Sequence, residues 1–265
     1  MGSVTPNGTT VPHHLLGAHN KQKTAPYTLP RNKLKRRITN ADKIPLVLVA
    51  CGSFSPISVL HLQMFEMSER YAEGTDFEVV GSYLSPVSDA YQKPSLVPAH
   101  HRLVMCSLAV EDTNIMVDPW EAEQFNEDGM PVYTKTVDVL QHFDYEINEV
   151  HGGIQTPDGT YKKAQVVLLI GADVAMTMGD PNVWATSDLD QILGLYGAFI
   201  VERPAQTNIE QALGPLKQYD KIWVVTAQYN DVSSTKIRSQ LRNGEDVVDL
   251  PKKVIEYIRT HDLYD

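Results

Sequence analysis

The chain has 265 residues, a formal net charge of −10 at pH 7 and a sequence pI of about 5.3. Proteins that bind long tracts of nucleic acid are broadly basic, so this acidic balance predicts no nucleic-acid partner. No apolar run reaches the roughly 18 to 20 residues of a membrane span, and the N-terminus lacks the apolar segment of a secretory signal. We therefore expect an intracellular protein with no membrane partner.

The first 43 residues show neither helical nor strand periodicity, and we interpret residues 1–43 as a disordered basic tail. The basic end of the tail has two readings, a nuclear-import signal or an ordinary solvated run, and the sequence favours neither. The expected compartment is therefore the nucleus, the cytoplasm or both. The basic cluster consists of Arg31, Lys33, Lys35, Arg36 and Arg37.

From residue 44 onward, short apolar runs rich in β-branched residues alternate with segments of helical period. This alternation predicts an α/β fold with a Rossmann-like, doubly wound parallel sheet, in a single domain over residues 44–265. Ligands of such folds bind at the carboxyl ends of the strands. The predicted strands are Leu46–Ala50, Val79–Leu84, Ile115–Val117, Val166–Ile170, Gly197–Val201 and Ile222–Thr226.

Residues 144–163 interrupt this alternation. The segment contains Gly152-Gly153 and Pro157-Asp158-Gly159, which are typical of turns, and it has little apolar content. We therefore expect an exposed loop over these residues, without chemistry of its own.

The first motif with chemical potential follows the first predicted strand and leads into a helix. Gly52 lets backbone approach a phosphate, Ser53 and Phe54 can present backbone N–H groups, and the start of the helix adds positive potential. His61 would then lie near the bound anion. The glycine and lysine spacings of a P-loop or a G-x-G-x-x-G fingerprint are absent. A packed helix histidine is the alternative for His61, but the motif context favours a phosphate contact.

This segment resembles the first motif of the HxGH-type nucleotidyltransferase superfamily, approximately G-[ST]-F-x-P-x-H-x-x-H. It departs from the motif at Ser58, where the usual first histidine is absent, and at Leu60, where the usual glycine is absent. The eukaryotic nicotinamide mononucleotide adenylyltransferases also lack the first histidine and keep the second, so the departure narrows the resemblance to that family. The matching residues are Gly52, Ser53, Phe54, Pro56 and His61.

The second motif follows the last predicted strand. Ser233 or Ser234 can cap a helix whose first turn holds a hydroxyl and two cations, and cations are unfavourable at a helix N-terminus unless an anion lies between them. A capped surface helix with ordinary basic residues is the alternative. The segment resembles the I-S-S-T-K-I-R signature of the same superfamily, with Val232 in the first position. The resemblance implies that the ATP phosphates are bound by Asn230, Ser234, Thr235, Lys236 and Arg238.

The resemblance to the eukaryotic adenylyltransferases continues between the two motifs and implies a mononucleotide site. In that site Lys93 would meet the mononucleotide phosphate, together with Ser53 and Phe54. Trp120 and Trp184 match the ring-binding positions of the family, where flat indole faces can sandwich a cationic pyridine ring. A solvated loop lysine and core-filling tryptophans are the alternatives.

The predicted strand Val166–Ile170 runs into Gly171-Ala172-Asp173. A carboxylate at the carboxyl end of a strand can accept hydrogen bonds from a ribose, and Gly171 lets the chain approach a ligand. The resemblance implies that Gly171 and Asp173 bind the ATP nucleotide. A simple helix cap by Asp173 is compatible with that role.

The resemblance further implies an enzyme of NAD biosynthesis that transfers AMP from ATP to nicotinamide mononucleotide, and also to nicotinate mononucleotide, with release of pyrophosphate. His61 would steady the α-phosphate, while Lys236 and Arg238 would balance the charge of the pyrophosphate. We expect Mg²⁺ as a cofactor bound through the ATP phosphates, without a protein metal site. A homo-oligomer is implied as well. The alternatives are a transferase with another phosphate-bearing acceptor, and a binding protein or chaperone that has kept the fold.

Overall fold

Six strands form one sheet, and every adjacent pair in it is parallel. All six were predicted from their β-branched, apolar runs, and the prediction is confirmed. A separate two-stranded antiparallel hairpin is formed by β4 (Ile154–Gln155) and β5 (Tyr161–Lys162). The strands of the large sheet are β1 (Ile44–Gly52), β2 (Phe77–Pro86), β3 (Ile115–Val117), β6 (Gln165–Gly171), β7 (Ala198–Val201) and β8 (Ile222–Val225).

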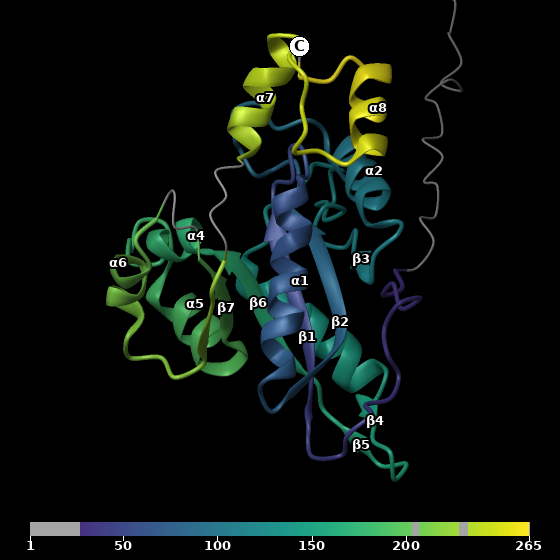
Figure 1. Ribbon diagram of the computed structural model, residues 1–265, viewed down its shortest axis with the longest axis vertical. Helices are drawn as coiled ribbons and strands as arrows, with labels where there is room; N and C mark the ends of the chain where they lie inside the picture. The colour runs from purple at the N-terminus through teal and green to yellow at the C-terminus, as the bar shows by residue number, and fades with distance from the viewer. Residues whose placement is uncertain (1–26, 203–206, 228–232, 265) are drawn as a thin grey trace, which may run out of the picture.

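The strand order in the large sheet is β3-β2-β1-β6-β7-β8 (Figure 1). The chain first moves outward from β1 through β2 to β3, then returns to place β6 on the other side of β1. The order therefore reverses between β1 and β6, and a reversal of this kind opens a crevice at the carboxyl ends of the two strands. The computed structural model that shows this arrangement describes residues 27–202, 207–227 and 233–264.

Both faces of the sheet are covered by helices. Successive residues of β1 point to opposite faces, so Val47 and Val49 join one core cluster while Leu46 and Leu48 join the other. This confirms the predicted doubly wound α/β class. The first of these clusters includes residues of α3 (Thr136–Asp144), η1 (Tyr145–Val150), α4 (Ala172–Thr177), α5 (Thr186–Gln191), η2 (Ile192–Tyr196), α6 (Ile209–Leu213) and η3 (Gly214–Leu216). The second includes residues of α1 (Val59–Glu73), α2 (Ala99–Val110), α7 (Ser234–Arg242) and α8 (Lys252–Thr260).

Helices α7 and α8 lie at one end of the molecule, and the hairpin of β4 and β5 lies at the other (Figure 1). Helix α1 ends at Glu73, and the N–H of Gly74 donates to the carbonyl of Tyr71 at 3.2 Å just after it. Within the part of the chain that the structure describes, no helix is both long enough and apolar enough to cross a membrane.

Residues 27–43 lie against the domain, so the predicted disordered tail is wrong for this stretch. Leu29 and Ile38 are only 2% and 1% exposed and belong to the core. The backbone N–H of Lys35 donates to the carbonyl of Val80 in β2 at 2.8 Å. An extended segment docks through single apolar residues, which leave no period of two or 3.6 in the sequence. Residues 1–26 of the predicted tail lie outside the described residues.

The basic cluster of this segment contacts backbone carbonyls of the domain. Lys33 Nζ donates to the carbonyls at the end of α2 and the start of β3, at 2.7 and 3.1 Å. Lys35 Nζ donates to a carbonyl of β2 at 2.9 Å, and Arg37 donates to two carbonyls after β4 at 3.2 and 2.9 Å. The cluster therefore joins the N-terminal segment to several separate parts of the fold.

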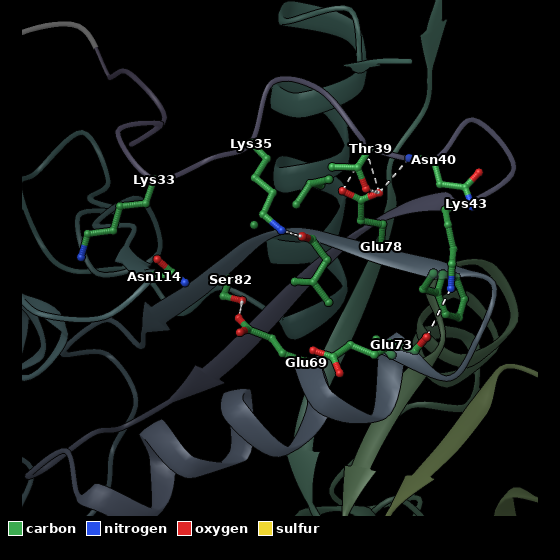
Figure 2. Close-up of a pocket in the computed structure, with 15 residues that line it drawn as sticks. Lys33, Lys35, Thr39, Asn40, Lys43, Glu69, Glu73, Glu78, Ser82 and Asn114 are labelled. Atoms are coloured by element: carbon green, nitrogen blue, oxygen red, sulfur yellow. Dashed lines mark hydrogen bonds between the residues drawn. The ribbon is translucent and has the colours of Figure 1, made fainter. Parts of the chain in front are cut away.

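A cavity of about 610 Å³ lies between this segment, β2 and α1. Figure 2 shows Lys33 and Lys35 on the segment, with Glu69 and Glu73 of α1 across from them. The lining carries both signs of charge and includes none of the residues predicted to bind ATP or the mononucleotide. This cavity is therefore a feature of how the N-terminal segment docks.

Residues 144–163 are not an exposed loop throughout, and this prediction is corrected. Ile147 in η1 and Ile154 in β4 are buried in the core. Asn148 is buried as well, and its side-chain amide donates to the carbonyl of Ala164 at 2.9 Å and accepts from the Ala164 N–H at 2.7 Å. A few buried residues therefore hold residues 144–163 against the domain, although the average composition of this segment is polar.

Candidate active site

The two predicted phosphate motifs meet beyond the carboxyl end of β1. Arg238 of α7 donates through Nη1 to the carbonyl of Ser55 at 2.7 Å, and Ser234 Oγ donates to the carbonyl of Pro56 at 3.1 Å. These pairs are 183 and 178 positions apart in the chain. The structure therefore brings together two segments that the sequence presents separately.

Helix α7 begins as the sequence predicted, and the open choice of N-cap is settled. The Ser233 side chain accepts from the backbone N–H of Lys236 at 3.2 Å, which makes Ser233 the N-cap. Thr235 and Lys236 then lie in the first helical turn, where the positive end of the helix dipole favours an anion. Arg238 is buried and donates through Nη2 to Thr235 Oγ1 at 3.1 Å.

His61 lies in the first turn of α1 and is oriented by Ser58. The Ser58 N–H donates to His61 Nδ1 at 3.0 Å, and Ser58 Oγ lies 2.8 Å from the same nitrogen. Because a backbone N–H only donates, Nδ1 is the acceptor, and the neutral ring carries its proton on Nε2. The ring therefore presents an N–H donor at Nε2, which is the form that a phosphate oxygen can accept from.

Gly52 and Phe54 shape the loop between β1 and α1. A Cβ at Gly52 would meet the ring of Phe54 at 3.0 Å, so this position has little room for a side chain. Phe54 itself has a φ of 42°, in the left-handed region that few non-glycine residues adopt. Its buried ring packs edge-on against His61, with ring centroids 5.2 Å apart. The Phe54 side chain thus helps to hold the His61 ring in place.

Two cations and an acid lie close together at the crevice. Lys93 Nζ donates to Ser53 Oγ at 3.3 Å. Partial desolvation lowers the pKa of Lys93, the positive charge of Arg238 lowers it further, and Asp173 acts in the opposite direction. Desolvation lowers the pKa of Arg238 too. A bound phosphate would raise both pKa values, because a nearby negative charge favours the charged form of each cation.

Gly171 and Asp173 stand at the carboxyl end of β6, which is paired with β1. Gly171 is the N-cap of α4, and Asp173 lies exposed in its first turn. Asn230, which was predicted to bind ATP, lies outside the described residues. The other predicted ATP-site residues lie at these strand ends and helix starts, and their contacts with ATP stay predictions. They are Gly52, Ser53, Phe54, His61, Gly171, Asp173, Ser234, Thr235, Lys236 and Arg238.

Trp120 follows β3 and has one indole face covered by protein. Its ring is parallel to that of His142 in α3, with centroids 4.0 Å apart and an interplanar angle of 5°. His142 therefore covers that face, and a ligand ring could stack on Trp120 only from the other side. Trp184 lies between α4 and α5, where its indole N–H donates to Thr177 Oγ1 at 2.9 Å. The predicted sandwich of a pyridine ring between Trp120 and Trp184 stays a prediction.

Arg102 supports the site, although the sequence suggested no role for it. It is fully buried, and its guanidinium donates to the carbonyls of Ser53 at 3.2 Å and Val87 at 2.7 Å. The same group pairs with Asp89 at 2.9 Å. A buried cation must be fully paired, so Arg102 ties the phosphate loop to the loop after β2. Arg102 precedes the apolar Cys106 by four positions in α2, so both lie on the same buried face of the helix. This helical spacing was the one signal in the sequence that Arg102 is buried.

Glu121, next to Trp120, was also missed by sequence reasoning. It is 3% exposed, and Ser85 Oγ donates to its carboxyl at 2.6 Å. Burial raises the pKa of Glu121 to about 8, against the opposing effects of Ser85 and Arg102. The group is therefore largely protonated near neutral pH. Nothing in the sequence separates Glu121 from the exposed acids nearby.

Comparison with known proteins identifies one matching family and several similar proteins. Residues 49–240 match the cytidylyltransferase-like family. A nicotinamide/nicotinic acid mononucleotide adenylyltransferase 2 of Saccharomyces cerevisiae is 46% identical over 90% of this chain, and the match spans 61% of that relative's length. A nicotinamide/nicotinic acid mononucleotide adenylyltransferase 1 of Bos taurus is 35% identical over 85% of this chain and 90% of its own length. An Arabidopsis thaliana nicotinamide/nicotinic acid mononucleotide adenylyltransferase is 35% identical, with coverage of 89% and 97%.

Proposed function

The chain belongs to the nicotinamide/nicotinic acid mononucleotide adenylyltransferases, and from this membership we propose that it transfers AMP from ATP to a pyridine mononucleotide. The products are the dinucleotide and pyrophosphate. The observation that carries the proposal is the junction of the two motifs, in which Arg238 and Ser234 of α7 bind the carbonyls of Ser55 and Pro56. That junction sets helix α7 beside the loop that leads into α1, where His61 lies.

In the proposed reaction a phosphate oxygen of the mononucleotide attacks the α-phosphorus of ATP. The bond between this phosphorus and the bridging oxygen of the β-phosphate breaks, and pyrophosphate leaves with the electron pair. No covalent enzyme intermediate is needed, because the attacking phosphate is already ionised. Positioning and charge stabilisation then supply the rate enhancement.

The side chains at the crevice suit these roles. His61 donates from Nε2 to the α-phosphate, since Nδ1 is held as an acceptor by Ser58. Lys93 holds the mononucleotide phosphate beside Ser53, while Lys236 and Arg238 balance the charge on the departing pyrophosphate. The mononucleotide and ATP therefore meet between β1 and α7.

Mg²⁺ would enter with ATP and neutralise phosphate charge there. The side chains at this site are mainly cations and hydroxyls, which suit phosphate oxygens better than a metal ion. Among the residues that the structure describes, no three His, Cys, Asp or Glu side chains form a metal-binding group. In this proposal the protein orients the nucleotide that carries the ion.

The proposed reaction is tested with purified protein, ATP, Mg²⁺ and a panel of acceptors that includes both pyridine mononucleotides, phosphopantetheine and a polyol phosphate. We expect equal amounts of pyrophosphate and dinucleotide with nicotinamide and nicotinate mononucleotide. Preference for a non-pyridine acceptor would replace the proposed substrate. No pyrophosphate release with any acceptor would favour a binding or chaperone role.

Assembly and location are two further proposals. Family membership supports a homo-oligomer. Size-exclusion chromatography with light scattering on the purified protein tests this. The basic cluster supports location in the nucleus as well as the cytoplasm, but Lys33 and Lys35 are held by backbone carbonyls, so import through this cluster requires the segment to detach. A fluorescent fusion carrying Lys33→Ala and Lys35→Ala should then lose nuclear enrichment. An unchanged distribution would remove the import proposal.

A further inference from the structure

The indole of Trp120 rests on a side chain that is itself held in place. His142 covers one indole face at a centroid distance of 4.0 Å. The ring of Tyr27, from the N-terminal segment, packs edge-on against His142 with centroids 5.0 Å apart. His142 therefore lies between Trp120 and Tyr27, two residues that are far apart in the chain.

Hydrogen bonds fix the rotation of the His142 ring. Tyr27 donates its hydroxyl hydrogen to Asp118 Oδ1 at 3.0 Å, since a carboxylate only accepts. The Tyr27 oxygen then accepts from Nε2–H of His142, at 2.9 Å. The second carboxylate oxygen of Asp118 is buried without a hydrogen bond and lies 3.4 Å from the same nitrogen. Two oxygens, one from Tyr27 and one from Asp118, thus lie close to the same ring nitrogen.

Burial makes this arrangement specific. The side chains of His142 and Asp118 are only 8% and 1% exposed. A buried carboxylate is unfavourable unless donors satisfy it, so Asp118 requires Tyr27 and His142 in their observed places. Burial also raises the pKa of Tyr27, which keeps its hydroxyl protonated as the donor. The backbone N–H of Trp120 lies 3.4 Å from the same carboxylate. Asp118 therefore links the backbone of Trp120 to the side chains of Tyr27 and His142.

We propose that Tyr27 and His142 are positioning residues that hold the Trp120 indole so that its outer face meets the pyridine ring of the mononucleotide. The inference rests on the proposed function. It makes the N-terminal segment, which the sequence suggested was a tail, part of the support of the mononucleotide site. Neither residue touches the reacting atoms, so their effect should appear in mononucleotide binding.

Steady-state kinetics of His142→Ala and His142→Phe test the proposal. Loss of the stacked ring in His142→Ala should raise KM for the mononucleotide about 2- to 12-fold, the worth of one aromatic pair, and leave KM for ATP unchanged. His142→Phe keeps a ring under the indole and should restore most of the difference. Equal increases in both KM values, or none, would overturn the proposal.

A double-mutant cycle shows whether His142 acts through Trp120. In the Trp120→Ala background, adding His142→Ala should cause no further loss of mononucleotide binding. Additive losses would mean that His142 acts by another route and would overturn the proposal. Tyr27→Phe should raise the same KM in wild-type protein, whereas Tyr219→Phe should not. Tyr219 is the matched control because its hydroxyl also donates to an aspartate, Asp190, at 2.7 Å.

A readout independent of catalysis separates this inference from the proposed function. The chain has three tryptophans, so replacing Trp184 and Trp223 with Phe leaves Trp120 as the only indole. In that background, His142→Ala and Tyr27→Phe should each change the emission of Trp120 and its quenching by acrylamide, and Tyr219→Phe should not. Unchanged emission would overturn the positioning role. An inactive wild type with changed emission would overturn the pyridine ligand and the proposed function.

Discussion

At the scale of the residue, the site depends on side chains that set the chemistry of their neighbours. Ser58 stands where the superfamily usually has its first histidine, and it makes Nδ1 of His61 an acceptor through its backbone N–H. Arg102 fixes the backbone of the loop after β1, because its guanidinium donates to the carbonyl of Ser53. Neither has to touch a nucleotide. The motif residues are predictable from local spacing, whereas such supporting residues depend on contacts that only the folded chain makes.

Replacing His61 with alanine should lower turnover by roughly 10² to 10³, the scale of losing one charge-stabilising donor. The fold should persist, because His61 is only partly buried and the Phe54 ring stays buried in the core. Single-turnover rates and the melting temperature of the variant check both statements. His100→Ala, which removes an exposed histidine from α2, is the matched control. A rate near that of the wild type would show that His61 does not contact the α-phosphate.

Glu121 should make stability depend on pH. Its folded pKa of about 8 lies above the ordinary value of 4.5, so the folded state holds the proton more tightly than the unfolded state. The stabilisation is complete below the unfolded pKa, falls as pH rises, and is lost above about 8. Glu121→Gln cannot ionise, so its melting temperature relative to wild type should be higher near pH 8 than near pH 5. A difference between Glu121→Gln and wild type that does not change with pH would contradict this.

At the scale of the element, regular structure was predictable where the apolar pattern repeats. Every strand of the large sheet except β2 carries a continuous apolar run, because helices cover both faces of the sheet. The irregular segments were not predictable in this way. Residues 144–163 attach through isolated positions such as Ile147 and Ile154, which a composition average cannot distinguish from an exposed loop.

Alanine replacement within that segment separates anchored from exposed positions. Ile147→Ala should lower the free energy of unfolding by about 2 to 5 kcal/mol, because it removes a fully buried side chain from the core. Tyr161→Ala, on the same segment but 63% exposed, should leave it nearly unchanged. Urea denaturation followed by circular dichroism measures both. Equal and small effects of the two substitutions on the free energy of unfolding would mean that the segment is an exposed loop, as its composition suggested.

At the scale of the whole molecule, the N-terminal segment connects parts of the fold that lie far apart. Its basic residues bind carbonyls near α2, β2 and β4, and Tyr27 reaches the residues that pack against Trp120. Charge patterning in the sequence pointed to solvent or an import receptor as the partner of these cations. Their actual partners are backbone carbonyls, which are present at every position of a chain and therefore leave no sequence signal.

The last prediction concerns this attachment. Lys33 Nζ donates to two carbonyls in a partly buried place, and charge-assisted hydrogen bonds contribute about 1.5 to 3 kcal/mol to stability. Lys33→Ala should therefore lower the melting temperature by roughly 3 to 10 °C. Lys252→Ala, at an exposed lysine that begins α8, should have little effect. An unchanged melting temperature for Lys33→Ala would show that the segment does not hold the domain together, and the basic cluster would again be explained by solvent or by an import receptor.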